Sequence, residues 1–252
     1  MSADISFEAL APAEIASKAE AIGVKKAGLP FWNMFFLAVL AGAFIGLGAI
    51  FATTVSAGSF AIKDAAGGAA FATALPYGVI RLITGLAFTL GLILVVIAGA
   101  ELFTGNNLII MAFMEGKVGI GKLLRNWVIV YLGNLVGSIA TALIMFVSKQ
   151  YTFGNGSIGL NALNIGEAKT GLDFLQAIAL GIMCNALVCL AVWMCYSART
   201  VTDKILAIIP PIAGFVAAGF EHSVANMYFI PYALFIKYFD PTYVTAVGDR
   251  VA

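Results

Sequence analysis

Polar residues interrupt a long apolar stretch near the end of this chain, in the segment Gly219-Phe220-Glu221-His222-Ser223-Val224-Ala225-Asn226. The segment contains the only histidine of the protein, His222, between the apolar flanks 205–220 and 224–236. Ionisable groups inside a membrane segment cost about 2.5–3.5 kcal/mol at mid-helix and therefore usually mark a transport pathway. An imidazole has a reference pKa of about 6.5, so it can exchange a proton near neutral pH. His222 is therefore the first candidate for the chemistry of this protein.

A second polar interruption lies in the first half of the chain, at Glu101-Leu102-Phe103-Thr104-Gly105-Asn106-Asn107, between the apolar runs 82–100 and 108–114. In both interruptions a glutamate is followed five residues later by an asparagine, and a short apolar run comes next. The N-terminal ends of such short helices carry partial positive charge and free N–H donors. Paired broken helices of this kind point to a transport site near the midplane of the membrane. The sequence therefore predicts a transport site between the two interruptions.

The composition requires a membrane around the elements that position these residues. Hydrophobic residues make up 62% of the 252 residues and charged residues only 11%, with a mean hydropathy of +1.00, which excludes an ordinary soluble domain. The net charge of +1 gives no indication of a nucleic-acid partner. Apolar runs of about 20 residues, the length of one span, predict five membrane segments of an all-α protein. These segments are 31–55, 82–114 with its break, 127–147, 174–196 and 205–236 with its break.

The distribution of lysine and arginine predicts the orientation of the chain. These residues concentrate in the N-terminal segment and in the predicted loops 115–125 and 197–204, which we therefore expect in the cytoplasm. The loops 56–81 and 154–173 then lie on the outside. The N-terminal residues 1–29 mix charges with apolar residues and predict an amphipathic helix. This helix either lies at the bilayer surface or acts as a mobile plug beneath a pore.

The two halves of the predicted pore domain, residues 30–252, resemble each other. Residues 30–150 would form one three-helix unit and 171–252 a second, inverted unit, with 36–42 matching 175–181. Nothing in the second unit mirrors the third segment of the first. We therefore expect this chain to end one transmembrane helix short of the natural protein, so that its second repeat is incomplete.

Metal binding and enzyme chemistry have little support in the sequence. The three cysteines, Cys184, Cys189 and Cys195, fall in one apolar segment, where partners on one helix cannot form a disulfide at these spacings. One histidine and scattered cysteines do not provide the ligands of a transition-metal site. The chain also has no cofactor motif and no nucleophile–base pair. We expect a protein that uses no cofactor or metal and is not an enzyme.

Four motifs resemble one known family over essentially the whole chain. They are Ala100-Glu101-Leu102-Phe103-Thr104, Asn126-Trp127-x-x-x-Tyr131-x-Gly133-Asn134-Leu135-Val136-Gly137, Val188-Cys189-Leu190-Ala191-Val192-Trp193-Met194 and Gly219-Phe220-Glu221-His222-Ser223-Val224-Ala225-Asn226-Met227. With these motifs the chain resembles the formate/nitrite transporter family, most closely its formate channels. The resemblance implies an aquaporin-like fold of six helices in two inverted repeats, with the second and fifth helices broken. It also implies a homopentamer in the bacterial inner membrane, with one pore in each protomer.

The resemblance assigns roles to individual residues. His222 resembles the central pore histidine of the family, flanked by Thr104 from the first break and Asn185 from the fourth span. Lys169 resembles a basic residue near the external mouth, and Glu221 matches the acidic neighbour of the histidine. Five apolar residues resemble the constrictions above and below the histidine: Phe88, Leu92, Phe103, Val188 and Phe215.

A channel for small monovalent anions, with formate as the first substrate, fits these residues best. Apolar rings block a hydrated ion, and no lysine or arginine lies inside the predicted segments to compensate its charge. Proton exchange at His222 would produce a neutral acid that crosses the rings more easily.

Several alternatives stay open or are disfavoured. Nitrite, hydrosulfide, acetate and lactate are alternative substrates of the same fold. A facilitator for water or glycerol is disfavoured because neither break contains Asn-Pro-Ala. An ammonium channel is disfavoured because one histidine cannot form the paired pore histidines of that class.

Overall fold

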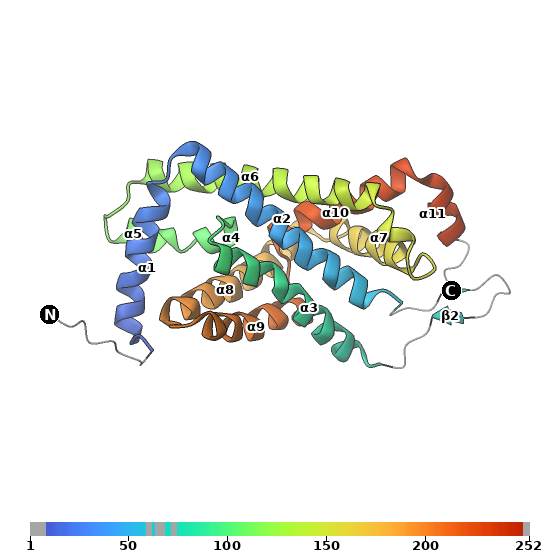
Figure 1. The fold of residues 1–252 in the computed structure, drawn as a ribbon, viewed down its shortest axis with the longest axis horizontal. Helices are drawn as coiled ribbons and strands as arrows, with labels where there is room; N and C mark the ends of the chain where they lie inside the picture. Colours follow the sequence, from blue (N-terminus) through green and yellow to red (C-terminus); the bar gives the residue numbers. More distant parts are fainter. Residues whose placement is uncertain (1–8, 59–61, 64–68, 72–74, 249–252) are drawn as a thin grey trace.

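The computed structural model describes residues 9–58, 62–63, 69–71 and 75–248, and most of them are helical. Figure 1 shows an elongated bundle in which long helices run along the molecule, with α1 (Pro12–Ala27) at one end and α7 (Ser157–Thr170) and α11 (Pro241–Gly248) at the other. Five of the described helices are long and apolar enough to cross a membrane. They are α2 (Phe31–Ser56), α3 (Tyr77–Ala98), α6 (Ile120–Val147), α8 (Phe174–Ser197) and α9 (Val201–Ala218). The remaining elements are α4 (Phe103–Asn106), α5 (Ile109–Met114), α10 (Ser223–Phe239), the 3₁₀ turn Gln150–Thr152 and the strand pair β1 (Ile62–Lys63) and β2 (Ala69–Phe71).

The long helices confirm the five predicted membrane segments, but one predicted loop is wrong. Residues 154–173 contain the helix α7, whose glycines and asparagines resemble loop composition. Packing against neighbouring helices stabilises this helix more than intrinsic propensity does. Asn161 of α7 donates hydrogen bonds to the Thr53 carbonyl of α2 and to Ser56 Oγ, both at 2.8 Å.

The start of α3 also differs from the prediction. Pro76 is the N-cap of this helix, so Tyr77 begins it and Arg81 lies inside the first turns. The prediction placed Arg81 in a loop because a charge usually ends an apolar run. As a consequence, Arg81 lies within a membrane-length helix.

Both predicted breaks are confirmed and have the same backbone construction. α3 ends at Gly99 and α9 ends at Gly219, with left-handed φ angles of 76° and 80° that glycine adopts without strain. The next N–H then binds a carbonyl five residues back: Ala100 to Val95 and Phe220 to Phe215, each at 3.0 Å. This Schellman geometry satisfies the last carbonyls of each helix. The short helices begin at residues 103 and 223, so each short helix includes the C-terminal part of a predicted polar segment, 101–107 or 219–226.

Each break is also anchored to the first long helix of its half. The Glu101 N–H donates to the Leu37 carbonyl of α2 at 3.2 Å, and the Glu221 N–H donates to the Leu180 carbonyl of α8 at 3.3 Å. Leu37 therefore corresponds to Leu180, which shifts the predicted match of 36–42 with 175–181 by one helical turn. Apolar helices look alike when they are shifted by a turn, so the sequence could not fix this register. The aquaporin-like pseudo-symmetry and the sixth helix stay predictions.

Glycines let α2 and α6 approach closely. A Cβ atom on Gly137 would lie 1.9 Å from the Val39 carbonyl oxygen, and one on Gly42 would lie 2.1 Å from that of Asn134. No side chain fits at these two positions unless the helices separate. Asn134 of α6 also donates to the Ala38 and Glu101 carbonyls, at 2.8 and 2.9 Å, so this contact supports the first break.

The Gly137→Ala variant is therefore expected to be strongly destabilised, by about 3 kcal/mol, because overpacking against backbone cannot be relieved by a rotamer change. The matched control is Gly121→Ala in the same helix, where a new Cβ has nothing within 4 Å. This control is expected to keep the parent melting temperature or to gain slightly from helix propensity. Thermal unfolding in detergent measures both, and equal melting temperatures would contradict the close approach of α2 and α6.

Candidate functional site

His222 lies at the start of α10 and caps that helix with its own side chain. Its Nδ1 accepts a hydrogen bond from the Ala225 N–H at 3.1 Å. A main-chain N–H can only donate, so Nδ1 is unprotonated and the neutral ring holds its proton on Nε2. Nε2 lies 3.3 Å from Thr104 Oγ1, on the other short helix. With both side chains buried, the two breaks meet at this contact.

The family resemblance predicted that Asn185 lies beside His222. Among the described contacts, none joins these two residues. Asn185 Oδ1 accepts from Asn107 Nδ2 at 3.3 Å, and its amide nitrogen lies 3.7 Å from Cys189 Sγ. Asn185 of α8 therefore positions the short helix that holds Thr104. Its role in the pathway stays a prediction.

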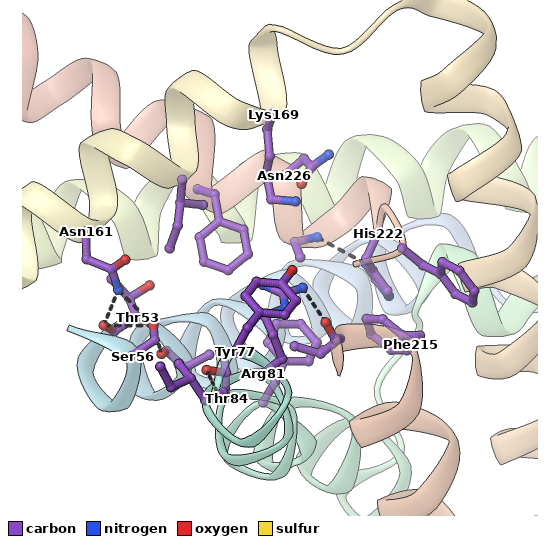
Figure 2. A pocket seen from close by; sticks show the side chains of 18 residues that line it. Thr53, Ser56, Tyr77, Arg81, Thr84, Asn161, Lys169, Phe215, His222 and Asn226 are labelled. Carbon is purple, nitrogen blue, oxygen red and sulfur yellow. Dashed lines mark hydrogen bonds between the residues drawn. The ribbon is translucent and has the colours of Figure 1, made fainter. Parts of the chain in front are cut away.

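A cavity of about 270 Å³ lies on one side of His222, and Figure 2 shows the side chains that line it. We call it the α7 cavity because Asn161 and Lys169 of α7 form part of its wall. Its floor is a cluster of three rings. The Phe88 and Phe215 ring centroids are 5.8 Å apart, and His222 lies 6.3 and 5.7 Å from them. Phe88 and Phe215 are only 3% and 2% exposed, so the rings leave little free passage.

A second cavity, of about 480 Å³, lies beside α1, and we call it the α1 cavity. Its wall includes Lys25 and Lys26 of α1, Leu92 of α3 and Leu102 in the break. The residues that line the two cavities do not overlap, and Leu92 lies one helical turn from Phe88 of the other cavity. Buried apolar side chains therefore separate two polar-edged spaces, as a constricted pathway requires.

The other predicted constriction residues have different surroundings. Val188 of α8 is 1% exposed in the same core cluster as Leu92 and Leu102. The Phe103 ring instead packs against Trp127 and Tyr131, with centroids 6.5 and 5.1 Å away. Its neighbour Leu102 lines the α1 cavity and has nearly the same backbone angles as His222, the N-cap of the other short helix. Leu102 is thus a site residue that the sequence analysis missed.

Each glutamate of the breaks belongs to an ion-pair network. On the α7 side, Lys169 Nζ lies 2.9 Å from both carboxylate oxygens of Glu221, which also accepts from Asn226 Nδ2 at 2.8 Å. Lys169 was predicted as a loop residue near the mouth. It lies on α7 instead, with a side chain only 17% exposed. Glu221 therefore acts first as the anchor of Lys169 and of the broken backbone.

The same network is repeated on the α1 side. Lys26 of α1 donates to Glu101 Oε1 at 2.7 Å and to Asn106 Oδ1 at 3.0 Å, and Asn106 Nδ2 donates to Glu101 Oε2 at 2.7 Å. A hydrogen-bonded ion pair between Glu20 and Lys117 also fastens α1 and raises the pKa of that exposed lysine. The described part of the N-terminal helix thus packs on the first break, and residues 1–8 of the predicted segment lie outside the described residues. The plug hypothesis stays a prediction.

Arg81 is the second site residue that the sequence analysis missed. Its guanidinium lines the α7 cavity and its Nη2 donates to the Val216 carbonyl near the end of α9. The positive group therefore neutralises part of the negative helix end beside His222. The signal that could have found it is the spacing of Arg81 from Phe88, two helical turns further along the same helix.

The described residues form five membrane-length helices, and the two breaks meet at His222. A cavity lies on either side of this contact. These features define a membrane transport protein. The model of the family described as "Formate/nitrite transporter" matches residues 13–249 of the chain. The formate channel FocA of Escherichia coli K12 is 43% identical over 99% of this chain and 83% of its own length. This chain belongs to the formate/nitrite transporter family. The expectation of a transport protein instead of an enzyme is thereby confirmed.

Solved structures agree with this membership. A structure described as a pentameric formate channel with formate bound has a TM-score of 0.78 and 47% identity, covering 88% of this chain and 82% of its own. A second, described as an FNT family ion channel, has a TM-score of 0.74 and 30% identity, covering 94% and 89%. The predicted all-helical membrane fold is confirmed by these similarities.

Proposed function

We propose that this protein is a channel for small monovalent anions, with formate as its first substrate. The observation that carries the proposal is the cluster of Phe88, Phe215 and His222 between the two cavities. A hydrated ion cannot pass rings that leave so little space, so the substrate must be small and must shed water. The names of similar proteins, formate channel and probable formate transporter, support formate over other anions.

His222 would supply the proton that lets formate cross the rings as a neutral acid. In the resting ring, Nδ1 accepts from the Ala225 N–H and Nε2 holds the single proton of a neutral imidazole. Donation therefore requires that Nδ1 first takes up a proton from solution and gives up its contact with Ala225. The resulting imidazolium passes its Nε2 proton, which faces Thr104, to formate and is left as a neutral ring with its proton on Nδ1. Formic acid is a stronger acid than imidazolium, and this transfer is uphill in water. Removal of water between the rings disfavours the charged form of the acid and reduces that difference. Thr104 Oγ1 would accept from Nε2–H and hold the ring in position for the transfer.

The proposed substrate is tested by flux into proteoliposomes that contain purified protein. Labelled formate is expected to enter much faster than it enters protein-free vesicles, and glycerol is expected to enter no faster. Nitrite, hydrosulfide, acetate and lactate, measured in parallel, rank the alternatives. Water or glycerol flux without any anion flux would overturn the proposal in favour of a neutral-solute facilitator.

We further propose a homopentamer in a bacterial inner membrane, with the α1 end in the cytoplasm. The pentameric state of the similar solved structure supports the assembly, and the lysine and arginine distribution supports the orientation. Large apolar side chains on the outer faces of the long helices, such as Phe36, Ile144 and Ile182, would contact lipid or a neighbouring subunit. Native mass spectrometry from detergent is expected to give a mass of five chains, and a pure monomer would contradict the assembly.

A further inference from the structure

One buried donor on the wall of the α7 cavity has no partner in the protein. Arg81 reaches from α3 to the end of α9, where Nη2 binds the Val216 carbonyl. Its Nε is buried and, among the residues that the structure describes, has no hydrogen-bond partner. A buried N–H without a partner costs about 1–3 kcal/mol, so such groups usually face a ligand or an ordered water.

One buried acceptor on the same wall is also unpaired. Asn226 Nδ2 donates to the Glu221 carboxylate, which can only accept, so the amide oxygen Oδ1 must face away from it. Within the described part of the chain Oδ1 has no partner. In the other break, Lys26 donates to the equivalent oxygen of Asn106. Lys169 instead donates to the Glu221 carboxylate. The Asn226 oxygen is therefore available to a ligand or a water molecule in the cavity.

The charged residues around the cavity indicate the charge of the ligand that it would bind. Arg81 and Lys169 each carry one positive charge, and Glu221, which pairs with Lys169, carries one negative charge. The positive charge of Arg81 is therefore uncompensated in this group. Its planar guanidinium presents adjacent N–H groups that match the two oxygens of a carboxylate. Figure 2 shows Arg81, Asn226 and Lys169 around one space next to His222.

We infer that Arg81 anchors one small carboxylate anion in the α7 cavity, before the anion reaches the Phe88 and Phe215 rings. One carboxylate oxygen accepts from Nε and the other from a neighbouring guanidinium N–H. Asn226 Oδ1 accepts from a water molecule that the anion keeps. A cavity of about 270 Å³ has room for the anion and several waters of about 30 Å³ each. The inference deepens the proposed function because it names the residue that takes the anion from solution.

Saturation-transfer NMR on the formate proton tests the site, with sodium formate titrated into protein in nanodiscs. Arg81→Gln is expected to raise the dissociation constant about tenfold, as for a lost hydrogen bond to a charged group. Arg81→Lys keeps the positive charge and a donor for the Val216 carbonyl but lacks the paired N–H groups of the guanidinium. We therefore expect formate to bind more weakly than to the parent, by about threefold or more. The matched control is Lys237→Gln, which removes one exposed positive charge from α10 and does not line the cavity.

The inference is overturned by unchanged binding in Arg81→Gln, by parent-like binding in Arg81→Lys, or by equal weakening in Lys237→Gln. If Arg81→Gln fails to fold, Arg81→Lys decides alone. Flux separates this result from the proposed function. If the parent protein binds formate through Arg81 but transports no anion, the proposed channel function is wrong and the proposed binding site stands. A parent that conducts formate, with an Arg81→Gln variant that binds it as tightly, would overturn only the site.

Discussion

Replacing His222 by asparagine is expected to flatten the pH dependence of formate flux while the protein stays folded. Asparagine is among the best N-cap residues, so its side-chain oxygen replaces Nδ1 as the acceptor for the Ala225 N–H. What it cannot replace is a ring that takes up a proton from solution and passes one on from Nε2, next to Thr104. If the proton crosses with the anion, parent flux rises as the pH falls, because the supply of protons increases.

Labelled formate flux measured from about pH 5 to about pH 8, the range in which histidine usually titrates, gives the result. The parent is expected to vary at least about tenfold over this range, in line with the contribution of a positioned proton donor. The variant should vary much less, at a melting temperature close to that of the parent. A His222→Asn protein with the parent's pH profile would show that His222 only caps α10 and contacts Thr104.

The Thr104→Val variant tests the contact between Thr104 and His222 from the threonine side. Valine keeps the shape of threonine but removes the hydroxyl that lies 3.3 Å from Nε2. If the hydroxyl only positions the ring, flux falls at every pH and the pH profile keeps its shape. A changed profile would instead assign Thr104 a part in the proton transfer.

The sequence predicted the site residues well where polar residues interrupt apolar runs. It predicted them less well where the rotation of a helix decides which side chains face the pathway. The breaks at Gly99 and Gly219 were predictable because a glycine followed by charged and polar residues rarely continues an apolar membrane helix. The contact of His222 with Thr104 followed from the motif resemblance and is present. Which neighbour faces the pathway depends on the rotation of the short helix, so Phe103 was chosen where Leu102 lines the cavity.

The errors in the fold have a common physical cause. α7 is stabilised by contacts with other helices, such as the hydrogen bonds of Asn161 to α2, and its own sequence looks like a loop. Arg81 was placed outside the membrane because a charge in an apolar helix is costly in isolation. That cost is reduced by the Val216 carbonyl at the end of α9, a partner far away in the sequence. Both errors concern partners that only the folded chain provides.

Phe215→Ala is expected to open the pathway to larger carboxylates. The Phe215 ring stacks on His222 at an interplanar angle of 26° and meets Phe88 edge-on, so its removal creates space at the narrow point beneath the α7 cavity. A hydrophobic pocket discriminates by about 10–200-fold for one methylene group. The ratio of lactate to formate flux should therefore rise by about tenfold or more, while the loss of a buried ring lowers stability by about 3–5 kcal/mol.

The matched control for this change is Phe146→Ala. Phe146 of α6 is partly buried and packs against Tyr151, at a centroid distance of 5.7 Å, and it lines neither the α7 cavity nor the α1 cavity. It should lose stability without a change in the lactate-to-formate ratio. Two results would count against selection by size at the rings: an unchanged ratio in Phe215→Ala, or an equal increase in Phe146→Ala. The first would place the limiting constriction on the other side of His222, at Leu92 and Leu102.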